Sequence, residues 1–215
     1  MPMDPSTVEQ YKRTLGRYLP AKAVDPTFDF IQQHNIHLHI TRERHSKLGD
    51  YRWPQLRHPF HEISVNGNLN PYTFLWVLLH EMAHLNTHQR YGNRVQPHGH
   101  EWQEEYRQLI MAYIANFPTD AATLMRTYCR QIPLSHSIGT KIETILHHYD
   151  PDYNPASDLS LNQLSPGTVF RPVAKPSLLF KAIEKRRTRW ICLNLDDKKQ
   201  YLVSGTAQVE IINNI

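Results

Sequence analysis

The stretch Leu79-His80-Glu81-Met82-Ala83-His84 decides how the fold and chemistry of this chain are interpreted. It is a His-Glu-x-x-His motif inside a long apolar segment, a context typical of a buried helix. Two histidines four residues apart lie on nearly the same face of a helix, so both imidazoles can bind one metal ion. The glutamate between them can act as a general base toward a water molecule that the ion activates. The motif therefore predicts a zinc hydrolase, with a peptidase as the leading candidate.

The segments around the motif predict an α+β domain with a small antiparallel sheet, covering residues 1–150. Asn70-Pro71 begins the motif helix, which we expect to run to about Arg90. A second helix follows Pro97 and stops at Pro118, and shorter helices are expected at about 119–131 and 142–148. Upstream, the patterns predict a helix ending before Pro20, a helix capped by Asp25, strands at 36–40 and 61–65, and a turn at Gly49-Asp50.

The pattern changes to short β segments after Ser165. Strands are expected at Thr168–Arg171, Leu178–Glu184, Thr188–Leu195, Gln200–Val203 and Ala207–Ile212, with a hairpin loop at 196–199. Five short strands in about fifty residues are typical of a small closed or half-closed barrel. We therefore expect a linker at 151–162 and a small all-β, barrel-like module at 163–215.

The composition is that of a protein with a packed core, and it argues against a disordered, disulfide-rich or membrane-spanning protein. Hydrophobic residues make up 40% of the chain and charged residues 20%, which argues against global disorder. Two cysteines, Cys129 and Cys192, are too few for a disulfide framework or a four-cysteine zinc site. No apolar run is long enough to span a membrane, and no signal peptide is visible. We expect a soluble, cytoplasmic protein without a membrane partner; the oligomeric state is not indicated.

A catalytic zinc normally takes a third protein ligand, and three downstream histidines are candidates. His88 lies about 12 Å along the helix axis from His80, too far to share one ion. His98 and His100 stand at the start of the next helix and can turn back toward the first. Because they are two residues apart, they point in different directions, so we expect only one of them to bind.

The run from His80 to Leu85, followed by Pro97-His98-Gly99-His100-Glu101-Trp102, resembles the SprT-like metallopeptidases. Those proteins combine His-Glu-x-x-His with a downstream His-Gly-x-x-aromatic motif. The resemblance covers roughly residues 5–130 and implies a zincin-like helical domain, a Zn²⁺ cofactor, His98 as third ligand and Trp102 as an aromatic packing residue. It also implies a protein or peptide substrate, including proteins attached to DNA. Many members carry a four-cysteine zinc ribbon, which is missing here because only Cys192 lies in that region.

The basic residues are concentrated in the C-terminal segment. Residues 160–215 contain nine Lys/Arg against four Asp/Glu, whereas residues 1–159 contain fifteen against sixteen. Basic residues near aromatic ones can bind a phosphate backbone and stack on bases. The candidate nucleic-acid contacts are Lys181, Lys185, Arg186, Arg187, Arg189 and Trp190. The alternative is a solvated hairpin over an ordinary core.

Three functions therefore compete. The first is a zinc peptidase in which Glu81 accepts the proton of the attacking water. The second is a non-proteolytic, zinc-binding regulator, and the third is a nucleic-acid-binding adaptor that acts through the β module. Glu81 favours the first over the second, since a structural zinc does not need it. An oxyanion stabiliser is not identified by the sequence, although Tyr91, Tyr106 and the non-ligand histidine are candidates.

Overall fold

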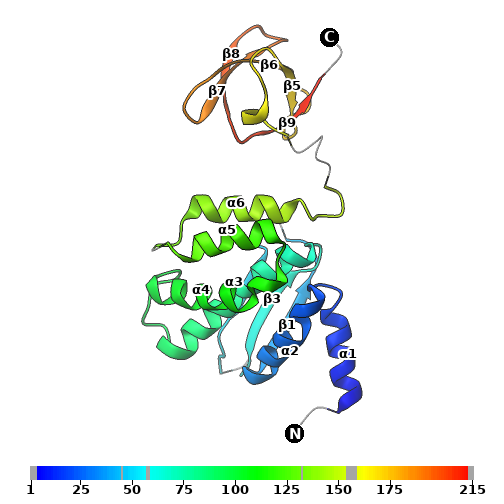
Figure 1. Ribbon diagram of the computed structural model, residues 1–215, viewed down its shortest axis with the longest axis vertical. Coiled ribbons are helices and arrows are strands. Elements are labelled where there is room, and N and C mark those ends of the chain that lie inside the picture. The colour runs from blue at the N-terminus through cyan, green and yellow to red at the C-terminus, as the bar shows by residue number, and fades with distance from the viewer. Residues whose placement is uncertain (1–3, 45, 57–58, 132, 154–158, 213–215) are drawn as a thin grey trace. The chain divides into compact units, whose positions relative to one another are not determined.

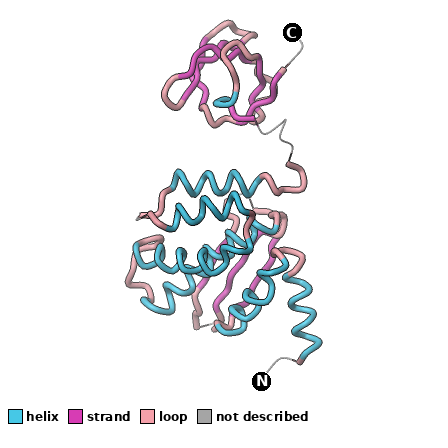
Figure 2. The backbone as a smooth tube through the Cα atoms, viewed as in Figure 1, coloured by secondary structure: helices cyan, strands magenta, loops and turns pink. Residues whose placement is uncertain are grey.

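The computed structural model describes residues 4–44, 46–56, 59–131, 133–153 and 159–212. The chain divides into two compact units, Met1–Pro151 and Asp152–Ile215, and each has its own hydrophobic core. Helices surround a small sheet in the first unit, and the second unit consists mainly of strands (Figure 2). The α+β fold class is confirmed. No helix among the described residues is long and apolar enough to cross a membrane.

The first unit begins with helices and a three-stranded sheet and continues with four further α-helices (Figure 1). Its elements are α1 (Pro5–Leu15), η1 (Ala21–Ala23), α2 (Val24–Gln33), β1 (Ile36–Thr41), β2 (Gly49–Arg52), β3 (His61–Asn66), α3 (Pro71–Tyr91), α4 (His100–Tyr113), η2 (Ile114–Asn116), α5 (Thr119–Cys129) and α6 (His136–His147). Helix α2 starts after Ala23, so the cap expected at Asp25 is wrong. Helix α6 begins six residues earlier than expected.

The sheet of the first unit is mixed, so the expected antiparallel sheet is wrong in one of its two pairings. Strand β3 lies between the other two in the order β1-β3-β2. It pairs antiparallel with β2, with Tyr51 opposite Ile63, and parallel with β1, with Ile36 opposite His61. The parallel pair arises because β3 enters between β1 and β2 instead of adding to the outside of β2.

The turn expected at Gly49-Asp50 is also wrong, because both residues open strand β2. The glycine has a packing role at this point. A Cβ atom at Gly49 would lie 2.4 Å from Glu81 Oε1 and 2.7 Å from the Val77 side chain. A glycine inside a strand often marks the close approach of another element, and here that element is helix α3.

Helix α3 is the central element of the first unit and starts as predicted. The Asn70 side chain accepts hydrogen bonds from the backbone N–H groups of Tyr72 and Thr73, and Pro71 occupies the first turn. The helix ends at Tyr91, and the following residue, Gly92, has a φ of +62°, which a glycine adopts without steric cost. Eleven of its residues are buried, among them Glu81, so the motif is fixed within the packed interior.

The second unit is a six-stranded antiparallel sheet in the order β4-β9-β5-β6-β7-β8. Its elements are β4 (Leu159–Ser160), η3 (Leu161–Gln163), β5 (Val169–Pro172), β6 (Phe180–Lys185), β7 (Arg189–Asn194), β8 (Gln200–Ser204) and β9 (Gln208–Ile211). The five expected strands are present within a few residues of their predicted bounds. The sheet does not close into a barrel, because β4 and β8 are its two edges. Part of the expected linker, residues 159–162, belongs to this unit, where Leu161 is fully buried.

Candidate metal centre

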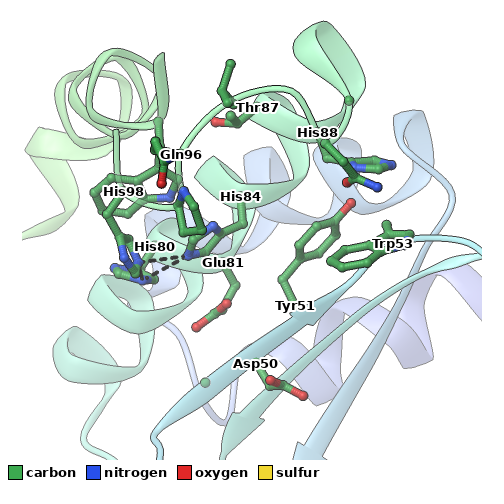
Figure 3. A pocket seen from close by; sticks show the side chains of 16 residues that line it. Asp50, Tyr51, Trp53, His80, Glu81, His84, Thr87, His88, Gln96 and His98 are labelled. Carbon is green, nitrogen blue, oxygen red and sulfur yellow. Dashed lines mark hydrogen bonds between the residues drawn. The ribbon is translucent and has the colours of Figure 1, made fainter. Parts of the chain in front are cut away.

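Three histidines converge at one point of the first unit (Figure 3). His80 and His84 lie one turn apart on α3, and His98 reaches them from the loop before α4. Their Nε2 atoms are 3.2 Å apart for His80 and His84, and 3.1 Å apart for each of the two pairs with His98. His100 is not part of the cluster that the described residues form. The structure therefore brings together the three residues predicted as ligands.

The donor set fits a metal ion. Ligand nitrogens bonded to zinc at about 2.05 Å in a tetrahedral arrangement lie about 3.3 Å apart, close to the spacing of this triangle. Metal binding requires neutral imidazoles with free lone pairs. Burial lowers the pKa of His80 to about 3 and that of His84 to about 4, and it also lowers the pKa of His98. The group can therefore bind a metal ion, and imidazole nitrogen suits zinc among several transition metals.

The His98 side chain is held in place by an unusual backbone and a side-chain clamp. His98 has a φ of +57°, in the left-handed region that non-glycine residues rarely adopt. The Gln103 side chain donates a hydrogen bond to the His98 carbonyl (3.1 Å) and accepts one from the backbone N–H of Leu134 (3.0 Å). Gln103 thus ties the ligand loop to the segment between α5 and α6.

Trp102 forms an aromatic wall behind the three histidines, in agreement with its predicted packing role. Its ring centroid lies 4.7 Å from that of His80, 5.3 Å from that of His84 and 4.6 Å from that of His98. The indole is almost completely buried, and Tyr106 packs against both it and His80. This packing restricts the rotation of the imidazole rings.

Glu81 borders the same cleft as the three histidines, and its side chain extends toward Asp50 (Figure 3). It is only 7% exposed. Burial raises the pKa of Glu81 to about 7, and the nearby Asp50 carboxylate adds to the rise, while Lys47 and Arg44 oppose it. A carboxylate with a raised pKa is a stronger base than an ordinary glutamate, which suits a group that must accept a proton.

The cleft has a volume of about 560 Å³ and contains residues that the sequence did not single out. Strand β2 and the residue that follows it by one position contribute Tyr51 and Trp53 to its lining. His88 is half-buried, and its ring is stacked on that of Trp53 with the centroids 5.7 Å apart. It does not belong to the metal cluster, as the axial distance predicts. Tyr51 lies in β2, a strand that the sequence pattern did not reveal, and Trp53 comes directly after it.

The basic residues of the second unit are exposed, but the aromatic residue assigned beside them is not. Lys181, Lys185, Arg186, Arg187 and Arg189 are all exposed. Trp190 is 3% exposed and donates a hydrogen bond from Nε1 to Asn162 Oδ1, so it cannot stack on a base as expected. The reason is strand alternation, which places Trp190 on the core side of β7.

The comparisons with known proteins agree with the site. Residues 17–123 match the SprT-like family. The chain is 43% identical over 56 residues to Protein SprT of Pseudomonas fluorescens strain SBW25, covering 26% of this chain and 31% of that protein. It is 51% identical over 44 residues to Protein SprT of Pseudomonas aeruginosa strain LESB58, covering 20% of this chain and 24% of that protein. These matches span less than a third of either relative's length. No solved structure matches the chain significantly.

Proposed function

Because the chain belongs to the SprT-like family, we propose that it is a zinc-dependent metallopeptidase whose ion is held by His80, His84 and His98. The observation that carries the proposal is the triangle of Nε2 atoms with a buried carboxylate, Glu81, in the same cleft. A structural zinc site is usually closed by four protein ligands, whereas a catalytic one has three and an open position. Three histidines beside an accessible cleft correspond to the second arrangement.

The proposed reaction assigns one proton-transfer role to Glu81. A bound zinc ion would polarise the scissile carbonyl and acidify the attacking water. Glu81 accepts one proton from that water as its oxygen bonds to the carbonyl carbon, and delivers the proton to the amide nitrogen as the C–N bond breaks. The products are a carboxylic acid and an amine, and Glu81 returns to its starting state.

Strand β2 suits the binding of an extended substrate. It is an edge of the three-stranded sheet formed by the described strands, and its residues line the cleft. An edge strand presents backbone N–H and C=O groups that can pair with another extended chain. This favours an unfolded protein segment or peptide as the substrate.

The test is metal-dependent proteolysis by the purified protein. We expect close to one zinc per chain, cleavage of an unstructured protein such as casein, loss of cleavage with a chelator, and recovery when zinc is returned. Zinc without cleavage of any unstructured protein or peptide would instead support the non-proteolytic, zinc-binding regulator. We also propose a reducing, cytoplasmic location, since Cys129 and Cys192 are both free thiols.

A second candidate function is nucleic-acid binding by the β6–β7 hairpin, which would direct the peptidase to DNA-associated proteins. A surface groove of about 580 Å³ is lined by Arg186, Arg187 and Arg189, together with residues of β8. Exposed arginines can neutralise a phosphate backbone, and such binding weakens as salt rises.

Fluorescence anisotropy with labelled single-stranded DNA tests this second function. We expect binding at low salt that weakens at high salt and that is lost when Arg186, Arg187 and Arg189 are all replaced by alanine. Absence of binding even at low salt would remove the second function and leave the peptidase proposal intact.

A further inference from the structure

Tyr51 stands in the cleft beside the metal ligand His84 (Figure 3). The two rings are parallel, with an interplanar angle of 1° and centroids 6.5 Å apart. Tyr51 comes from β2, the strand whose Gly49 lies against Glu81. Tyr51 therefore lines the same cleft as the three histidines and the carboxylate, and it has no role in the peptidase reaction proposed above.

A chain of hydrogen bonds leads away from the Tyr51 hydroxyl. Tyr51 Oη is 2.9 Å from His61 Nδ1. On the other side of that ring, His61 Nε2 is 3.4 Å from Gln89 Nε2. Gln89 Oε1 in turn lies 2.8 Å from His34 Nδ1. Four side chains from β2, β3, α3 and the end of α2 are thus connected in one row.

The amide group of Gln89 determines which atom is the donor in each of these hydrogen bonds. An amide oxygen only accepts, so His34 donates from Nδ1, and an amide nitrogen only donates, so His61 accepts at Nε2. A neutral imidazole carries one proton, and that of His61 must then be on Nδ1, from which it is donated to Tyr51 Oη. Burial lowers the pKa of His61, which keeps the ring neutral. The Tyr51 hydroxyl proton is consequently not used by His61.

We propose that Tyr51 is a further catalytic residue, whose hydroxyl donates a hydrogen bond to the oxyanion that forms on the scissile carbonyl. The inference rests on the proposed peptidase function. Attack by water places negative charge on that oxygen, and a fixed donor in the cleft stabilises it. His61 and Gln89 are positioning residues, because they occupy the lone pair of the tyrosine and leave its proton available.

Gln89→Glu is the most informative variant. It reverses the donor and acceptor roles in the hydrogen bonds of His61, and residue 89 does not line the cleft. A carboxylate only accepts, so His61 would have to donate from Nε2 and accept at Nδ1. The Tyr51 proton would then be held by His61 and lost to the substrate. Gln89 is exposed, so the substitution leaves the core intact.

Nitrogen-15 NMR of the zinc-loaded protein shows which ring nitrogen of His61 carries the proton, and it does not require catalytic turnover. At about pH 8.5, where imidazoles are neutral, we expect the His61 proton on Nδ1 in the wild type and on Nε2 in Gln89→Glu. A wild-type His61 that carries its proton on Nε2 would overturn the proposal.

Steady-state kinetics provide a second test of the role of Tyr51. For Tyr51→Phe we expect kcat to fall about 100-fold, with KM within about twofold and zinc content unchanged. Gln89→Glu should lower kcat in the same direction. The matched control is Tyr11→Phe, which removes the hydroxyl of an exposed tyrosine on α1, outside the cleft lining, and should leave kcat unchanged.

The two proposals can fail separately. An active wild type with undiminished kcat in Tyr51→Phe overturns the role of Tyr51 alone. A wild type that binds zinc but cleaves no substrate overturns the peptidase function and the role of Tyr51 with it.

Discussion

Gly49 lies directly against Glu81, because a Cβ atom at Gly49 would come within 2.4 Å of the carboxylate oxygen Oε1. The edge strand of the sheet and the motif helix therefore approach each other at the proposed general base. The absence of a side chain at Gly49 leaves the space that the carboxylate occupies. The position of Glu81 is thus set by two elements, only one of which contains the motif.

Gly49→Ala should therefore displace Glu81 and lower kcat while zinc stays bound. The added methyl group would also meet Val77 at 2.7 Å, so we expect a loss of about 1–3 kcal/mol in the free energy of unfolding. Zinc analysis, kinetics and denaturant unfolding on one preparation separate these effects. The matched control is Gly67→Ala, which meets Ile40 at 2.7 Å and is absent from the cleft lining. It should lower stability and leave kcat unchanged; equal loss of kcat in both variants would contradict the prediction.

Glu81→Gln should abolish cleavage without releasing the metal. The amide has nearly the shape of the carboxylate but cannot accept the proton of the attacking water. General-base catalysis contributes typically 10²–10⁴-fold, so we expect kcat to fall by about three orders of magnitude or more. Zinc content by mass spectrometry should equal that of the wild type. Cleavage at the wild-type rate by the metal-loaded variant would show that Glu81 is not the base.

The parts of the site that were predictable are those set by local spacing. His80, Glu81 and His84 lie within five residues of one helix, and the cap at Asn70 marks where that helix begins. The parts that were missed depend on strand order. Glycine followed by aspartate at positions 49 and 50 is typical of a turn, and only the packing of β2 against α3 shows why residue 49 is a glycine. The cleft role of Tyr51 follows from the same strand.

The C-terminal unit shows the same division. Its strands were predictable from alternation and turn residues, but alternation has two possible phases. The pairing of Trp190 with Val203 and the burial of the indole place that residue in the core, whereas the neighbouring Arg189 is exposed. The prediction that Trp190 contacts nucleic acid was therefore wrong, because it rested on the nearby basic residues in the sequence and not on the side of β7 that Trp190 occupies.

His98→Ala and His100→Ala should differ sharply in zinc content, although the two positions are only two residues apart. His98 Nε2 lies 3.1 Å from the corresponding atoms of both His80 and His84, whereas His100 begins α4 with an exposed side chain. We expect His98→Ala to lose most of the metal and His100→Ala to retain it near one equivalent. Zinc retained by both variants would mean that the third ligand is wrongly assigned.

Gln103→Leu should weaken zinc binding, although Gln103 is not one of the three proposed metal ligands. His98 holds a left-handed φ of +57°, a conformation that costs about 1–3 kcal/mol for a non-glycine residue and persists only where its surroundings enforce it. The Gln103 side chain supplies part of that constraint through the His98 carbonyl and the Leu134 N–H.

Removing the clamp should let the loop relax and lower zinc affinity about 10–100-fold, measured by competition with a chromophoric chelator. Gln108→Leu is the matched control, because Gln108 lies on the same helix and its side chain donates a hydrogen bond to Glu104 instead of to the His98 carbonyl. It should bind zinc as the wild type does. Unchanged affinity in Gln103→Leu would show that the packing of Trp102 alone positions His98.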